Sequence, residues 1–264
     1  MAAGRKWRKP PLIKDARLRY LLIVGSLVYL ALAIGTMEIN WTRMWEGIPR
    51  GQRFIAAFFP PDFTSRWDSI LDGLLESLWM TVTSTVVGVA ISVPVGLGAA
   101  RNLAPLPVYY FCRAIVALSR TFPEIILAIF FVKLFGFGPF AGFLALSLAT
   151  VGFYAKLLAE DIEAMDPSQA EAIRATGASW FQWLEYAIRP QVMPRMIGLA
   201  VYRLDINFRE SAVVGIVGGG GIGATLLTAF DRYEFDSAAA ILLVIIAIVM
   251  GLEYGSSWVR RMVQ

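Results

Sequence analysis

The chain has 264 residues, of which 57% are hydrophobic and 17% are charged, whereas soluble domains have about 45–50% apolar and about 25% charged residues. It contains no histidine and one cysteine, which excludes histidine-based metal centres, histidine general bases and an intrachain disulfide. The composition therefore predicts an all-α polytopic membrane protein with no metal site.

Six hydrophobic runs are long enough to cross a bilayer, which takes about 18 or more apolar residues. In chain order they cover residues 18–37, 74–100, 108–134, 140–159, 192–214 and 238–258. Pro94 lies in the second run and Pro123 in the third. Membrane helices tolerate such residues where neighbouring helices satisfy the freed backbone groups, so we expect kinked helices that pack closely together.

The residues before the first run are rich in Lys and Arg, which favour the cytoplasmic side of a membrane. The sequence therefore predicts a basic cytoplasmic tail over residues 1–17 and a six-helix transmembrane domain over residues 18–264. Both termini then lie in the cytoplasm, and segments 38–72 and 218–237 lie outside. This topology accounts for the net charge of +4, so no nucleic-acid partner is expected.

The first outside segment mixes aromatic and basic residues, which suits the headgroup layer of a membrane. They are Trp41, Trp45, Phe54, Phe58 and Phe59 with Arg43, Arg50 and Arg53. We expect a short interfacial helix that ends before Pro60-Pro61. A docking surface for a binding protein is the alternative, and both roles are compatible.

A polar segment, EAIRATGASWFQWLEYAIRP, separates the fourth and fifth runs and contains Glu171, Ala172, Gly177 and Pro190. It predicts a short amphipathic helix, a break, and a helix that restarts at Pro190. The pattern resembles the EAA loop of ABC-importer permeases. This resemblance implies a cytoplasmic coupling segment, at about residues 161–190, that docks on a partner ATPase. An ordinary surface helix is the alternative.

A glycine-rich segment, GIVGGGGIGATL, follows the fifth run and includes Gly218, Gly219, Gly220, Gly221 and Gly223. Its spacing fits G-x-G-x-x-G, but the flanking runs are membrane helices and not the βαβ unit of a dinucleotide site. A phosphate loop would need Lys where Ala224 stands. The glycines instead predict a helix break with close backbone contacts, at a translocation path or a dimer interface.

The stretch FRESAVVGIVGGGGIGATL, followed by DRYEFDSAAAILLVI, resembles the phosphonate-uptake branch of ABC-importer permeases, to which the methionine-uptake permeases are related. The matching residues are Arg209, Glu210, Gly215, Gly218, Gly220, Gly221, Ile222 and Gly223. The segments RWDSILDGLLESLWMTV and LSRTFPEIILAIFFV are also similar to this branch. One departure is Ala187-Ile188-Arg189-Pro190, where such loops commonly end in Ile-x-Leu-Pro.

This resemblance implies the type I importer permease fold and import of phosphonate or a related phosphorus oxyanion, such as phosphite, phosphate or a phosphate ester. Import of methionine or another small solute is the alternative. The resemblance also implies a homodimer in a bacterial inner membrane, with an extracytoplasmic binding protein and two ATPase subunits that hold ATP and Mg. No cofactor is expected in this chain.

Ionisable residues inside hydrophobic runs are costly and often functional. Arg120 and Glu124 in the third run, and Asp205 and Arg209 in the fifth, are spaced to meet on one helix face. Two interpretations stay open: ion pairs that fix helix packing, or a substrate pathway in which a guanidinium matches an oxyanion. The predicted pathway residues are Arg120, Glu124, Arg203, Asn207, Arg209 and Glu210, of which Arg203, Asn207 and Glu210 share a face.

An enzyme is the distant alternative. The sequence has no histidine, a single cysteine and no G-x-S-x-G pattern, so a nucleophile with its base is not recognisable. Buried carboxylates such as Glu124 and Glu210 are the remaining candidates for acid–base chemistry. The sequence therefore predicts a transport subunit without catalytic residues.

Overall fold

The computed structural model describes the chain except residues 1–12, 14, 38–39 and 264 and the side chains of residues 259, 260, 262 and 263. These residues form eleven α-helices and two π-helical turns and no strand, which confirms the predicted all-α fold class. The chain divides into two compact units, Met1–Ala56 and Ala57–Gln264. Most of the predicted basic tail, residues 1–17, lies outside the described part.

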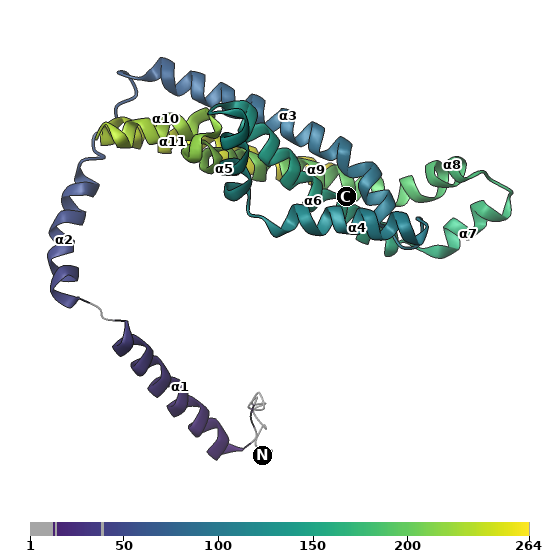
Figure 1. Cartoon of the computed structure of the whole chain (residues 1–264), viewed down its shortest axis with the longest axis horizontal. Coiled ribbons are helices and arrows are strands. Elements are labelled where there is room, and N and C mark those ends of the chain that lie inside the picture. Colours follow the sequence, from purple (N-terminus) through teal and green to yellow (C-terminus); the bar gives the residue numbers. More distant parts are fainter. Residues whose placement is uncertain (1–12, 14, 38–39, 264) are drawn as a thin grey trace, which may run out of the picture. The chain divides into compact units, whose positions relative to one another are not determined.

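The first unit contains α1 (Ala16–Thr36) and α2 (Trp41–Ala56), which Figure 1 draws as two separate helices. The Asp15 carboxylate accepts a hydrogen bond from the Arg17 backbone N–H, 2.9 Å away, and so caps α1. A helix of 21 residues is about 31 Å long, enough to cross a hydrocarbon core of about 30 Å. α1 coincides with the first predicted span, and α2 is the short helix expected before the two prolines.

The second unit is a bundle of longer helices joined by short ones (Figure 1). Its elements are α3 (Trp67–Ala99), α4 (Leu106–Thr121), α5 (Glu124–Phe135), α6 (Pro139–Glu163), α7 (Pro167–Ala175), α8 (Trp180–Trp183), η1 (Leu184–Ile188), α9 (Arg189–Val214), η2 (Gly215–Gly219), α10 (Gly221–Asp231) and α11 (Phe235–Val263). Among the described residues, α1, α3, α6 and α11 are each long and apolar enough to cross a membrane. Two bent helix pairs raise the number to six, the predicted number, if each pair forms one span. The second pair includes α10, which the sequence predicts to lie in an outside segment.

The third predicted span, residues 108–134, is not a single rod. α4 ends at Thr121, α5 begins at Glu124, and the two helices meet at 92°. Proline disfavours the helical conformation of the residue before it, and Phe122, which precedes Pro123, has an extended backbone with φ −100° and ψ 127°. The predicted i,i+4 contact between Arg120 and Glu124 is therefore wrong, because the helix that would carry it is interrupted between them.

The fifth predicted span starts earlier than expected. The helix restarts at Trp180 and not at Pro190, because Ser179 and Gln182 form a capping box there. The helical stretch then runs through the π-turn η1, in which the Arg189 N–H donates to the Leu184 carbonyl five residues back. Since proline has no N–H and clashes with the carbonyl four residues before it, this wider turn accommodates Pro190 without ending the helix.

Small residues bring α3 and α6 together over most of their length. A Cβ atom placed on Gly88 would lie 2.6 Å from Thr150 Cβ and 3.0 Å from the Ser147 carbonyl oxygen, and one placed on Gly96 would lie 2.8 Å from Leu158 Cδ2. Membrane helices associate through such close approaches, since lipid provides no hydrophobic driving force between them. The contact between α3 and α6 therefore depends on residues without large side chains.

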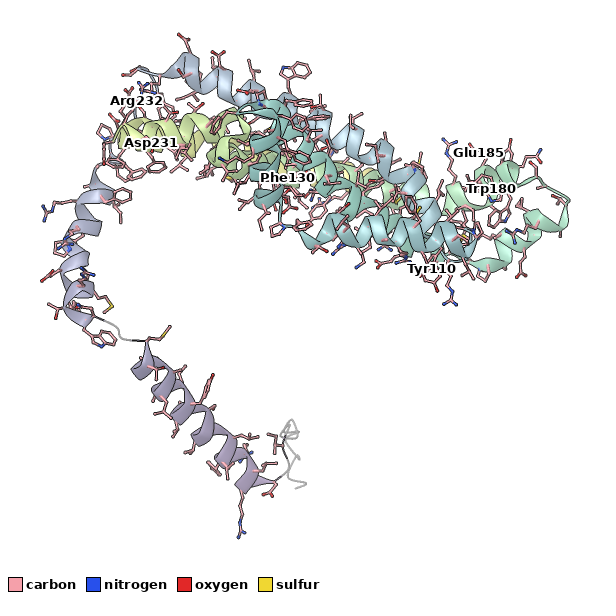
Figure 2. All side chains as sticks on the ribbon, viewed as in Figure 1. Tyr110, Phe130, Trp180, Glu185, Asp231 and Arg232 are labelled. Atoms are coloured by element: carbon pink, nitrogen blue, oxygen red, sulfur yellow. The ribbon has the colours of Figure 1, made fainter. Side chains whose placement is uncertain are left out.

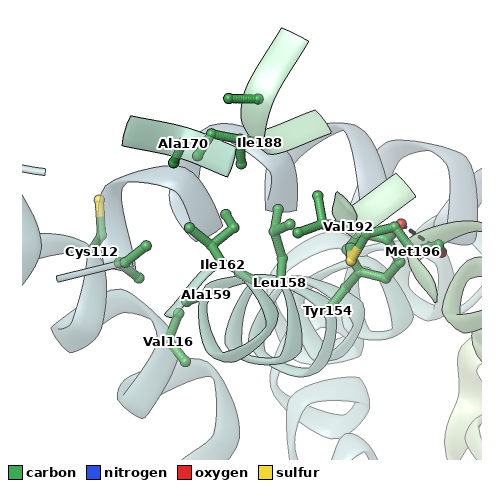
Figure 3. Packing of buried hydrophobic residues seen from close by; sticks show 14 of the residues in the cluster. Cys112, Val116, Tyr154, Leu158, Ala159, Ile162, Ala170, Ile188, Val192 and Met196 are labelled. Carbon is green, nitrogen blue, oxygen red and sulfur yellow. Dashed lines mark hydrogen bonds between the residues drawn. The ribbon is translucent and has the colours of Figure 1, made fainter. Parts of the chain in front are cut away.

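An apolar cluster packs α6 against α9 and α7 (Figure 3). Tyr154, Leu158 and Ile162 of α6 belong to this cluster together with Met196 of α9 and Ala170 of α7. The Tyr154 hydroxyl donates to the Met196 carbonyl oxygen at 2.9 Å, so this buried polar group is satisfied. The cluster holds the polar segment around α7 to one end of the bundle.

We predict that Gly88→Ala lowers stability by about 1–3 kcal/mol, the usual cost of overpacking, because the new methyl group meets Thr150 and a backbone carbonyl. Gly251→Ala in α11 is the matched control, since a Cβ there meets nothing within 4 Å. Thermal unfolding of the purified protein in detergent measures both variants. Equal unfolding temperatures for the two variants would contradict this packing.

Candidate functional site

The polar face of α9 forms a buried cluster around Arg203, as its spacing predicts. The Arg203 side chain is only 3% exposed, and its Nη2 lies 3.2 Å from Glu210 Oε2. Its Nε donates to Thr150 Oγ1 of α6 at 3.1 Å, and its guanidinium lies over the Phe153 ring, 5.4 Å from the centroid. The guanidinium therefore contacts a carboxylate, a hydroxyl group and an aromatic ring of the protein.

Glu124 joins the same cluster from α5. One of its carboxylate oxygens lies 3.8 Å from Arg203 Nη2, so one guanidinium faces two carboxylates. The side chains of Glu124 and Glu210 are 34% and 26% exposed, and they form the accessible side of the cluster. Glu124 begins α5 directly after the bend at Pro123, which explains why it pairs with α9 and not with Arg120.

Asn207 connects this cluster to α3. Its amide nitrogen donates to Thr85 Oγ1 of α3 at 2.8 Å and to Thr150 Oγ1 of α6 at 3.0 Å, and it is completely buried. Sequence reasoning missed both threonines. Thr85 lies on the buried face of α3 that also carries Gly88, and this stripe of small and hydroxyl residues was the available signal. The set Glu124, Arg203, Asn207, Glu210, Thr85 and Thr150 is called the Arg203 cluster below.

Two predicted pathway residues lie outside this cluster. Arg209 pairs with Asp205 at 2.6 Å, which confirms the predicted i,i+4 contact, and its side chain is 48% exposed. Arg120 is exposed, and within the described part of the chain no ion pair joins it to Glu124. The structure thus gathers Glu124, Arg203, Asn207 and Glu210 and leaves the other two arginines at the surface of the unit.

The glycine-rich segment forms the predicted break, between η2 and α10. Gly218 and Gly220 have φ of 99° and 77°, which disfavour residues with a Cβ. The Gly138 N–H donates to the Gly218 carbonyl at 2.9 Å, and the Ile222 N–H donates to Ser77 Oγ of α3 at 2.9 Å. The α3 hydroxyl therefore caps α10, and the freed backbone groups are satisfied by neighbouring segments. Gly219, Gly221 and Gly223 are buried in the same break.

The polar segment predicted to couple to an ATPase contains a defined helix with a defined end. The Ser168 N–H donates to the Asp166 carboxylate at 3.0 Å, which caps α7 and holds the pKa of Asp166 below its usual range. Glu171 and Ala172 are exposed on α7. Gly177 follows with φ 80°, and its N–H donates to the Arg174 carbonyl at 3.0 Å, the geometry that ends many helices.

The inner side of α7 is held to the bundle by Trp183. Its indole N–H donates to the Ala170 carbonyl at 2.9 Å, and the Arg174 guanidinium lies 3.9 Å from the centre of its ring. The adjoining α8 and η1 carry Phe181 and Tyr186, which are 76% and 68% exposed. Figure 2 shows Trp180 of α8 and Glu185 of η1 at this end of the unit, far from Arg232, which follows α10. The segment therefore presents an exposed surface on a base that is buried against the bundle.

We predict that Arg203→Met destabilises the protein by about 3–5 kcal/mol, the usual cost of removing one partner of a buried ion pair, because Glu210 is left without its counter-charge. The double variant Arg203→Met with Glu210→Gln should recover much of this loss, since the uncompensated charge is gone. Chemical unfolding in detergent compares Arg203→Met, Glu210→Gln and the double variant with the unchanged protein. If the double variant is as unstable as the sum of its single changes, the pairing is not what stabilises the cluster.

Residues 92–263 match the family model described as "Binding-protein-dependent transport system inner membrane component". The chain is 37% identical to the phosphate-import permease protein PhnE of Mycolicibacterium smegmatis, over 90% of this chain and 44% of the relative. It therefore spans less than half the length of that protein. It is 38% identical to the phosphite transport system permease protein PtxC of Stutzerimonas stutzeri, over 91% of this chain and 86% of the relative.

More distant relatives share the fold. A probable D-methionine transport system permease protein MetI of Vibrio cholerae is 26% identical, over 75% of this chain and 94% of the relative. The solved structure of the inward-facing MetNI methionine ABC transporter has a TM-score of 0.65 and 26% identity, covering 74% of this chain and 96% of its own. The predicted importer-permease fold is thereby confirmed. The family model covers more than half of the chain, which is thus a multi-pass membrane protein and belongs to the inner-membrane components of binding-protein-dependent transport systems.

Proposed function

We propose that this chain is the permease subunit of an ATP-driven importer for phosphonate or a related phosphorus oxyanion. The observation that carries the proposal is the ranking of the relatives. Those named for phosphate and phosphite import are 37–38% identical over nine-tenths of the chain, whereas the methionine permeases are 26% identical. Phosphonate, phosphite, phosphate and phosphate esters present similar oxygens, so the class is assigned and the individual anion is left open.

The proposed assembly is a homodimer with two ATPase subunits in the cytoplasm and one substrate-binding protein outside. Each chain offers up to six spans and one exposed α7 segment, and twofold symmetry is the commonest arrangement of identical subunits. ATP and Mg belong to the ATPase subunits. The basic residues before α1 support the cytoplasmic placement of both termini.

The proposed pathway passes the Arg203 cluster. A planar guanidinium suits a phosphorus oxyanion, but Arg203 is already bound by Glu210, Glu124 and Thr150. An anion that reaches Arg203 must therefore replace a carboxylate, which keeps the contact weak and reversible, as passage requires. The same ion pairs favour this role over acid–base catalysis by Glu124 and Glu210. The exposed Arg209 and Arg120 would attract the anion from outside the cluster.

Gly177→Val is expected to uncouple ATP hydrolysis from uptake, because a β-branched residue strains the left-handed turn that ends α7. Gly177→Asn is the matched control, since Asn tolerates this conformation and no atom lies within 4 Å of a Cβ at this position. Uptake and ATP turnover are measured in the reconstituted complex with equal amounts of permease. Normal uptake by Gly177→Val would show that this turn does not transmit the ATPase motion.

The function itself is tested by uptake into proteoliposomes that contain this chain, its ATPase and its binding protein. We expect ATP-dependent accumulation of labelled phosphonate, phosphite or phosphate, inhibited by the unlabelled anions and unaffected by methionine. Liposomes that lack the ATPase are the control. Accumulation of methionine, with no competition by any phosphorus oxyanion, would overturn the assignment and favour the methionine alternative.

A further inference from the structure

The short helix α2 has two distinct faces. With 3.6 residues per turn, its charged residues fall on one side: Arg43, Glu46, Arg50 and Arg53. Its large apolar residues, apart from Phe54, fall on the other: Trp41, Met44, Trp45, Ile48 and Ile55. A helix with one aromatic and aliphatic face and one arginine-rich face is typical of segments that lie flat in the membrane–water interface.

The apolar face of α2 is uncovered within its own unit. Its side chains are 47–66% exposed, from Met44 at 47% to Trp45 at 66%. In water, such a continuous apolar surface would be unfavourable, since burial of apolar area stabilises by about 25 cal/mol per Å². Lipid or another protein must therefore cover this face, and the position of α1 indicates which of the two does so.

α1 places the beginning of α2 at a membrane surface. α1 is long and apolar enough to cross the bilayer, and only residues 37–40 separate its end at Thr36 from Trp41. Four residues extend at most about 14 Å, and the headgroup layer on each side of the hydrocarbon core is about 5–8 Å thick. α2 therefore starts inside or next to this layer, whichever way α1 is oriented.

The charge of α2 complements anionic headgroups. Its three arginines exceed its single carboxylate, and only Arg50 pairs with that carboxylate, at 3.5 Å in an exposed i,i+4 contact. Among the described residues, Arg43 and Arg53 have no ion pair. Basic residues are attracted to an anionic membrane surface, and tryptophan concentrates at this depth.

We infer that α2 is an interfacial helix that binds the bilayer surface, with its tryptophan-bearing face among the lipid chains and its arginines on anionic phospholipid headgroups. The occupant of the apolar face is thus lipid and not a protein. This inference rests on the first unit alone and does not depend on the transported substrate. A binding protein that docks on α2 is the competing outcome of the test.

Nitroxide labels at Ile48→Cys and Glu46→Cys test this directly, because the two positions lie about 200° apart around the helix. Both are made in full-length protein with Cys112→Ser, in nanodiscs of phosphatidylcholine with or without phosphatidylglycerol. The Ile48 label should relax faster with oxygen, which concentrates in lipid, and the Glu46 label faster with a water-soluble nickel complex. Val24→Cys in the middle of α1 gives the reference for full membrane depth.

Phosphatidylglycerol should move the Ile48 label deeper into the membrane. The variant Arg43→Gln with Arg53→Gln should remove this dependence on the lipid. Equal access of nickel to both labels would overturn the inference, because α2 would then lie in water. Exclusion of both oxygen and nickel from the Ile48 label would also overturn it, since a protein surface would cover that face. If the depth of the Ile48 label is the same with and without phosphatidylglycerol when Arg43 and Arg53 are intact, the proposed role of anionic headgroups is overturned.

Discussion

One buried guanidinium constrains much of the second unit. A charge at membrane depth costs several kcal/mol unless it is paired, and Arg203 of α9 is only 3% exposed. Its partners come from three different helices: Glu124 from α5, Thr150 from α6 and Glu210 from α9 itself. Because the arginine must keep these partners, α5 has to turn toward α9, and the 92° bend between α4 and α5 supplies that turn.

Close helix packing makes this arrangement possible. Asn207 reaches Thr85 on α3 only because α3 and α6 approach closely along a face of small residues, where Gly88 lies against Thr150. Close packing also stabilises the glycine-rich break. Backbone groups that a continuous helix would satisfy form hydrogen bonds there with Ser77 and Gly138. The irregular segments of this membrane protein are thus stabilised by protein contacts, as a lipid environment demands.

The sequence predicted what depends on local composition and spacing. The hydrophobic runs became helices, Asp205 and Arg209 form the expected pair, and Gly177 has the left-handed backbone that its position suggested. It did not predict contacts between distant segments. A proline marks a break without giving its direction, so the meeting of Glu124 with Arg203 was not foreseen. The helix restarts before the predicted Pro190 because the capping box of Ser179 and Gln182, eight to eleven residues earlier, starts it.

We propose that the Arg203 cluster supports the fold and also provides the cation that a transported anion meets. Uptake of labelled phosphorus oxyanion by Arg203→Met with Glu210→Gln tests it most directly, because charge balance is kept while the guanidinium is removed. The matched control is Lys156→Met with Glu160→Gln, which removes a 3.4 Å ion pair outside the cluster. The account predicts a folded complex that hydrolyses ATP but takes up the anion more slowly than the control. Uptake equal to that of the control would contradict it and leave the cluster a purely structural role.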